Sequence, residues 1–240
     1  MEALRIDSAR RRIGVLALVW IGFVACAVAV GSQMPGATGV DSRISDWFAD
    51  NRTTALNKVT AVFSDLASTF VVIGIALGVI AVGVVLHRRG GIAVLVIAMV
   101  GEVTMFLTIT LLVDRTRPKV PHLDGAPPTS SFPSGHVFAT MVLWNAIAVV
   151  AVRQDWPAVL RRSVRVIAIA LPAAVGLSRI YRGMHHPTDV VAALVLGAVW
   201  SLAVVVVVLP GEPSSATADP RRHQLRRSQP GPLRPVDHRS

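Results

Sequence analysis

Six apolar runs divide the chain, and polar segments separate them. The runs cover approximately residues 13–30, 68–86, 91–113, 137–152, 164–178 and 189–209. A helix of about 20 residues crosses the hydrocarbon core of a bilayer, so runs of this kind indicate membrane spans. The run at 164–178 is short for a span, but it can continue into its polar end. The pattern therefore predicts an all-α fold, a bundle of six transmembrane helices.

The first run could also belong to a signal peptide, because Arg5 and Arg10 to Arg12 precede it and Ala27 to Ala29 loosely resembles a cleavage site. Its 18 residues exceed the usual length of about 7 to 15 for the apolar part of a signal peptide. We therefore expect an uncleaved first membrane helix.

The polar stretch between the first two runs contains Leu56, Val59, Phe63 and Leu66 at helical spacing. This spacing is typical of an amphipathic helix that lies on the membrane surface. A solvated loop with one packed face is the alternative interpretation.

Composition supports a membrane protein. Hydrophobic residues make up 52% of the 240 residues and charged residues only 16%, whereas soluble domains carry about 25% charged residues. The single cysteine, Cys26, excludes a disulfide framework and a cysteine metal site.

The net charge of +10 is explained by the positions of the basic residues. Sixteen of the 24 Lys and Arg residues lie before the first run, after the last one, or in the second and fourth connections between runs. Because basic residues favour the cytoplasm, both termini should be cytoplasmic, and the loops 114–136 and 179–188 should lie outside the plasma membrane. The charge thus reports topology and does not indicate a nucleic-acid partner.

Three parts of the chain follow from this pattern. Residues 1–12 form a cytoplasmic tail, residues 13–209 form the six-helix membrane domain, and residues 210–240 form a basic cytoplasmic tail. The last part is rich in Pro, Arg and Ser, and such a composition predicts disorder.

Basic and histidine residues gather in the two outer loops. The first group is Arg115 and Arg117, the second is Ser134, Gly135 and His136 at a helix start, and the third extends from Ser178 to Asp189. The topology places all three groups on one side of the membrane, although it was deduced without them.

These residue types suit phosphoryl transfer. The guanidinium groups of Arg117 and Arg179 can bind phosphate oxygens, and the helix start at Ser134 and Gly135 offers further N–H donors. His185 precedes Asp189 by four residues, so a carboxylate can hold one ring nitrogen while the other attacks phosphorus. His136 can protonate the leaving oxygen. No metal cluster is evident in the sequence, so the arginines must supply the positive charge and no cofactor is expected.

The sequence resembles the type 2 phosphatidic acid phosphatase superfamily. The family has three motifs: Lys, six residues, Arg-Pro; then Pro-Ser-Gly-His; then Ser-Arg, five residues, His, three residues, Asp. The second motif matches at Pro133 to His136 and the third matches in full from Ser178 to Asp189. The resemblance covers about residues 13 to 209, and six helices with an outward-facing site are also the family's pattern.

The resemblance implies a role for each motif residue. His185 is the implied nucleophile that forms a phosphohistidine, Asp189 is its orienting partner and His136 is the general acid. The implied phosphate ligands are Arg117, Arg179, Ser134 and Gly135.

One position departs from the family pattern. The lysine of the first motif should fall seven residues before Arg117, where this chain has Thr110. A threonine brings no charge, and we hypothesise that Arg115 or Lys119 supplies it as a further phosphate ligand. Interfacial contact of both side chains with lipid headgroups is the alternative.

Two more features call for an explanation. Glu102 lies in the middle of a membrane run, and helix depth predicts a buried contact with Asn145 on the next run. In the outer loop, His122 and Asp124 could hold a headgroup, or the proline-rich loop could be only a rigid cover.

The leading interpretation is a metal-independent membrane phosphatase that acts on a lipid phosphate or diphosphate, of the phosphatidic acid or isoprenoid diphosphate type. One alternative is a lipid phosphotransferase that passes the phosphoryl group to an acceptor alcohol. The other is a lipid-binding membrane protein that has lost catalysis, as the missing lysine would suggest.

Overall fold

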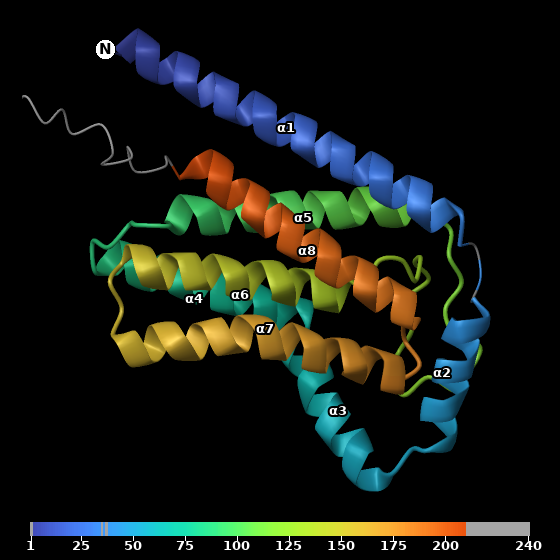
Figure 1. The fold of residues 1–240 in the computed structure, drawn as a ribbon. Coiled ribbons are helices and arrows are strands. Elements are labelled where there is room, and N and C mark those ends of the chain that lie inside the picture. Colours follow the sequence, from blue (N-terminus) through green and yellow to red (C-terminus); the bar gives the residue numbers. More distant parts are fainter. Residues whose placement is uncertain (1, 35, 37, 210–240) are drawn as a thin grey trace, which may run out of the picture. The chain divides into compact units, whose positions relative to one another are not determined.

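The structure is a computed structural model that describes residues 2–34, 36 and 38–209; the predicted tail 210–240 lies outside the described residues. The described chain is all-helical, as expected, and contains eight helices (Figure 1). Their bounds are α1 Glu2–Ser32, α2 Gly39–Asp50, α3 Thr54–Leu66, α4 Thr69–Val85, α5 Ile92–Leu112, α6 Gly135–Arg153, α7 Ala158–Tyr181 and α8 Pro187–Val208.

Five of these helices are long and apolar enough to cross a membrane, namely α1, α5, α6, α7 and α8. Helices α3 and α4 pass the same test only as a pair, which is bent by 48° and would make the sixth span. The short run at 164–178 is the central part of α7. This helix continues beyond the run at both ends and has 24 residues in all.

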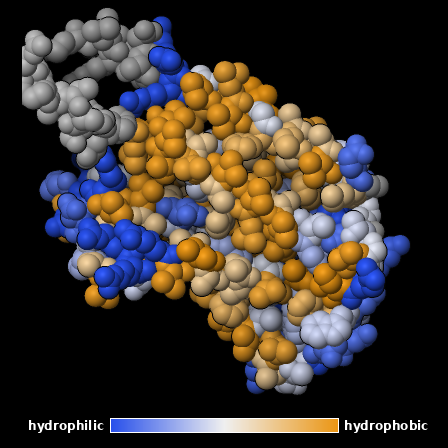
Figure 2. Space-filling model, viewed as in Figure 1, coloured by the Kyte–Doolittle hydropathy of each residue, from blue (hydrophilic) through white to orange (hydrophobic). Residues whose placement is uncertain are grey.

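Helix α6 lies at the centre of the bundle and packs against α4, α5, α7 and α8 (Figure 1). Its side chains Val137, Phe138, Val142 and Leu143 are fully buried. Large apolar side chains such as Phe70, which is 90% exposed, cover the outside of the bundle. An apolar exterior of this kind fits contact with lipid, and Figure 2 shows it as a broad hydrophobic band with hydrophilic residues toward its ends.

The two ends of the bundle carry different segments. One end, here called the basic end, holds the start of α1, the end of α8 and the loops 86–91 and 154–157 (Figure 1). Arg12 donates a hydrogen bond to the Val208 carbonyl there. The other end, the motif end, holds α2, α3 and the two loops that carry the sequence motifs. The segments assigned to opposite sides of the membrane therefore lie at opposite ends, while the cytoplasmic location of the basic end remains a prediction.

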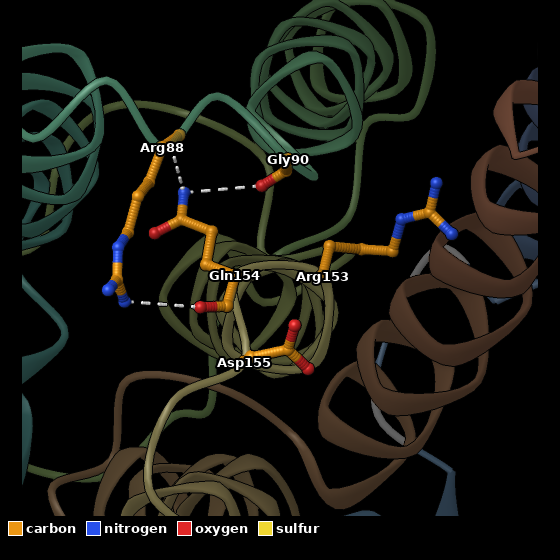
Figure 3. Close-up of a pocket in the computed structure, with 5 residues that line it drawn as sticks. All are labelled: Arg88, Gly90, Arg153, Gln154 and Asp155. Atoms are coloured by element: carbon orange, nitrogen blue, oxygen red, sulfur yellow. Dashed lines mark hydrogen bonds between the residues drawn. The ribbon is translucent and has the colours of Figure 1, made fainter.

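Gln154 ties the two short loops of the basic end together (Figure 3). Its amide donates to the carbonyls of Arg88, at 2.6 Å, and Gly90, at 3.2 Å. Arg88 donates back to the Gln154 carbonyl at 3.3 Å. These bonds satisfy backbone groups at the ends of α4 and α6 and fix the spacing of the two hairpins beside a cavity of about 300 Å³.

The expected amphipathic helix is α3. Leu56 and Val59 are exposed, whereas Thr60 and Ser64 face the protein. The apolar side therefore points outward, as a helix at the membrane surface requires. The preceding helix α2 was not predicted; it begins with a capping box in which Thr38 and Asp41 each bond the other's backbone N–H.

No direct hydrogen bond joins the side chains of Glu102 and Asn145 in the described part of the chain, and the predicted contact between them stays a prediction. The Asn145 amide donates to the Met141 carbonyl of its own helix at 2.8 Å. The Glu102 side chain is buried, with 3% of its surface exposed.

Gly101 sets the separation of α5 and α8. A Cβ at this position would lie 2.0 Å from the ring of Trp200, which is buried and donates from Nε1 to the Ala98 carbonyl at 2.9 Å.

We predict that Gly101→Ala lowers the free energy of unfolding by about 1–3 kcal/mol, because the indole must leave its site. Thermal unfolding in detergent measures this. The control Gly74→Ala, where a Cβ has open space, should unfold no earlier than the wild type; equal losses in both variants would contradict the packing argument.

Candidate active site

Three distant segments meet at the motif end. The Ser134 N–H donates to the Asp189 carbonyl at 3.3 Å and thereby joins the starts of α6 and α8. Arg117, just beyond α5, donates to the Met184 carbonyl at 2.7 Å. The structure thus brings the three predicted groups of residues together, although they are up to 74 positions apart, between Arg115 and Asp189.

His185 is 4% exposed and has one defined ring partner. Its Nδ1 lies 2.8 Å from the Ser131 carbonyl oxygen. A carbonyl oxygen only accepts, so Nδ1 carries the proton and Nε2 keeps a free lone pair. Burial lowers the pKa of His185, and the Asp189 carboxylate opposes this shift while Arg179 and Arg117 add to it. The imidazole is therefore neutral at neutral pH, as a nucleophile must be.

Asp189 is completely buried and is held by three donors. Arg115 Nη1 donates to Oδ1 at 2.5 Å, while the Ser131 hydroxyl and the His186 N–H donate to Oδ2 at 2.5 and 2.8 Å. Oδ2 lies 3.8 Å from His185 Nδ1, which is longer than a hydrogen bond. The carboxylate therefore acts on His185 through its charge, and the Ser131 carbonyl is the hydrogen-bond partner of the ring.

Arg117 Nε, Arg179 Nε and Ser134 Oγ are three donors at the site that are buried and lack a hydrogen-bond partner within the described residues; Arg115 Nε and His186 Nδ1, close to Asp189, also lack one. An unpaired buried donor costs about 1–3 kcal/mol, so such a group in a native structure calls for a ligand. Burial also lowers the pKa of Arg117, with the Asp189 charge opposing the shift. The three residues are among those expected to bind phosphate.

The start of α6 completes the site. At Gly135 a Cβ would lie 2.8 Å from the Phe106 ring of α5, so the close approach of the two helices requires glycine. His136 is half-buried in the first turn, and its ring has no hydrogen-bond partner among residues 2–34, 36 and 38–209. The N-terminal amides of α6 and its dipole favour an anion here.

Arg115 differs from its expected role. It is 1% exposed, and its guanidinium bridges Asp189 and Asp41, with Nη2 2.8 Å from Asp41 Oδ2. Because both terminal nitrogens of the guanidinium group, Nη1 and Nη2, already bond carboxylates, this geometry does not favour Arg115 as a phosphate ligand. Lys119, the other candidate for the missing lysine, is exposed.

A second cluster of hydrogen bonds and ion pairs surrounds Asp124. Its carboxylate accepts from Arg179 Nη1 at 2.7 Å, from Arg182 Nε at 2.8 Å and also from Arg182 Nη2. Ser64 of α3 donates to it at 3.1 Å. Asp124 thus orients Arg179, whereas His122 bonds only the Pro118 carbonyl. Burial alone would raise the pKa of Asp124, but Arg182, Arg179 and Ser64 together hold it below its ordinary value.

Four contributors to the site were not predicted from the sequence in these roles: Asp41, Ser64, Asp124 and Ser131. Ser131 adjoins the second motif, which is the only sequence signal that could have drawn attention to it. No group of three or more His, Cys, Asp or Glu residues able to hold a metal ion occurs in the described ranges.

The comparisons with known proteins agree with this arrangement. The model of the PAP2 superfamily matches residues 89–210, which is half of the chain. The chain therefore belongs to the PAP2 superfamily. The comparison with curated proteins gives no match.

Two solved structures share the fold. One is the first transmembrane PAP2 type phosphatidylglycerolphosphate phosphatase from Bacillus subtilis, with a TM-score of 0.63 and 22% sequence identity over 79% of this chain and 92% of that one. The other is LpxE from Aquifex aeolicus, with a TM-score of 0.56 and 17% identity over 70% of this chain and 96% of that one. At these identities the likeness concerns the fold, which is that of membrane PAP2 phosphatases.

The ion pairs of Asp124 generate a prediction about pH. A carboxyl group whose pKa is lowered by folding stabilises the fold at neutral pH, and this stabilisation is lost as the pH falls through the folded-state pKa. Asp124→Asn should therefore lower the free energy of unfolding at pH 7 by about 1–3 kcal/mol. The difference from the wild type should shrink below about pH 4.

Thermal unfolding at both pH values measures this difference. Asp155→Asn is the control. Asp155 is exposed, and its single ion pair, with Arg161, is long at 3.9 Å, so this variant should have the unfolding temperature of the wild type. A deficit of Asp124→Asn that is equally large at low pH would contradict the assignment.

Proposed function

We propose that this protein is a multi-pass membrane phosphatase that hydrolyses a lipid phosphate or diphosphate, of the phosphatidic acid or isoprenoid diphosphate type. The observation that carries the proposal is the set of buried, unpaired donors on Arg117, Arg179 and Ser134. Arg117 bonds the Met184 carbonyl, the His185 N–H donates to the Arg179 carbonyl and the Ser134 N–H donates to the Asp189 carbonyl, which supports one shared site for these donors and His185. Membership of the PAP2 superfamily supports the same reaction class.

The reaction has two steps. In the first, His185 Nε2 attacks phosphorus, the bond from phosphorus to the leaving oxygen breaks, and protonated His136 gives its proton to that oxygen. A phosphohistidine forms and the dephosphorylated lipid leaves. In the second, neutral His136 takes a proton from water, the resulting hydroxide attacks phosphorus, and inorganic phosphate leaves His185.

The phosphate ligands stabilise the charge that accumulates on the phosphoryl oxygens in both steps. Arg117 and Arg179 supply two positive charges, and Ser134 with the first amides of α6 adds neutral donors. This charge takes the place that a divalent cation has in other phosphatases, so the reaction is proposed to need no metal. Asp189 offsets the positive charge that the His185 ring acquires when Nε2 is phosphorylated.

The substrate class follows from where the site lies. The motif end is bordered by apolar helices and by the outward apolar side of α3. A lipid can therefore keep its tail in the membrane and present its phosphate sideways to the site. The distribution of basic residues supports an outward-facing site in the plasma membrane, with both ends of the chain in the cytoplasm.

The nucleophile provides the direct test. His185→Ala should reduce phosphate release by a factor of about 10⁴ or more, because it removes the covalent route. Release is measured from a panel of glycerolipid and prenyl phosphates, with and without a chelator, which should have no effect. His122→Ala is the matched control, since His122 is exposed at the same end of the molecule, and it should retain wild-type activity. Equal release by His185→Ala and the wild type would overturn the mechanism.

Thr110 generates a prediction on substrate binding. It lies one helical turn beyond Phe106 on the same face of α5, and Phe106 touches Gly135, so Thr110 faces the start of α6. Thr110→Lys should restore the charge of the first motif and lower KM by about tenfold, with 1.4 kcal/mol of added binding. Steady-state kinetics of the variant and the wild type measures this change in KM. Thr108→Lys, two residues earlier and therefore on another face of α5, is the control; an equal decrease of KM in both variants would indicate a general charge effect.

A further inference from the structure

Helix α2 lies outside the matched region 89–210, yet it contributes a buried carboxylate to the site. Asp41 is 0% exposed. It accepts hydrogen bonds from the N–H and the hydroxyl of Thr188, at 3.1 and 2.9 Å, and from the Thr38 N–H at 3.2 Å. Thr188 directly precedes Asp189, so Asp41 fixes the backbone next to the carboxylate that faces His185.

Asp41 also reaches Asp189 through Arg115. The guanidinium binds Asp41 with Nη2 and Asp189 with Nη1, and all three side chains are fully buried. One positive charge thus lies between two negative charges, which leaves the group with a net charge of −1. Without Asp41, the pair of Arg115 and Asp189 would be neutral.

We propose that Asp41 is a positioning residue for phosphoryl transfer: through Arg115 and Thr188 it holds Asp189 beside His185 and leaves a net negative charge there. This inference rests on the proposed function. The negative charge stabilises the imidazole ring when phosphorylation of Nε2 makes it cationic, because the opposite charges attract strongly inside a protein. Within the described residues, Asp41 makes no hydrogen bond to the unpaired donors of Arg117, Arg179 and Ser134.

This placement predicts a separation of kcat from KM. Asp41→Asn keeps the size of the side chain and removes its charge. It should lower kcat by about 10- to 100-fold, the range seen when a partner that orients a functional ligand is lost. KM and the inhibition constant of inorganic phosphate should stay within about twofold, because the phosphate ligands are intact.

Two further variants complete the experiment. Asp46→Asn, an exposed position on the same helix, should have wild-type kinetics. Arg115→Lys keeps the positive charge but replaces the planar fork, which reaches one carboxylate with each terminal nitrogen, by a single point charge, so it should also lower kcat at unchanged KM. If thermal unfolding in detergent shows that Asp41→Asn does not fold, the kinetics of Arg115→Lys test the positioning role instead: a wild-type kcat in this variant would overturn the inference.

A folded Asp41→Asn variant with wild-type kcat would overturn the inference. A rise of KM that accounts for the whole loss of kcat/KM would overturn it as well, since it would place Asp41 in substrate binding. Failure of the proposed function is separate: it would appear as phosphate release that His185→Ala does not reduce.

Discussion

The structure of the motif end depends on the neutralisation of one carboxylate. Asp189 lies at the start of a membrane-spanning helix with no exposed surface, where an unpaired charge would be very costly. Arg115, the Ser131 hydroxyl and the His186 N–H meet this requirement together. Satisfying this one group therefore fixes the end of α5, the segment before α6 and the start of α8 relative to each other.

The two short helices α2 and α3 each contribute a polar side chain to the site. Helix α2 supplies Asp41 to the group around Asp189, and α3 supplies Ser64 to the group around Asp124 and Arg179. The donors of Arg117, Arg179 and Ser134 that have no partner in the described chain belong to the same end of the molecule. The part of the chain before the family-matched region thus belongs to the architecture of the site as much as to the membrane anchor.

Sequence patterns predicted the bundle better than its polar contacts. Apolar runs identified α1 and α4 to α8, because burial in lipid demands continuous hydrophobicity. The motifs predicted that three distant segments lie close together, and hydrogen bonds join these segments at the motif end. The pairing of Asp41 with Arg115 joins residues 74 positions apart, and no local spacing encodes it. Helical depth predicts that Glu102 and Asn145 lie at one level of the bundle, but it does not specify the direction in which a side chain points, and Asn145 bonds the Met141 carbonyl of its own helix.

The carbonyl that holds the His185 ring belongs to the main chain of Ser131. Replacement of the Ser131 side chain removes the hydroxyl bond to Asp189 but leaves this acceptor in place. The tautomer of His185 is therefore protected against point mutation at residue 131, and only a change in the backbone path before α6 could alter it. Genetic drift can weaken the electrostatic support of the histidine more easily than it can reverse which nitrogen carries the lone pair.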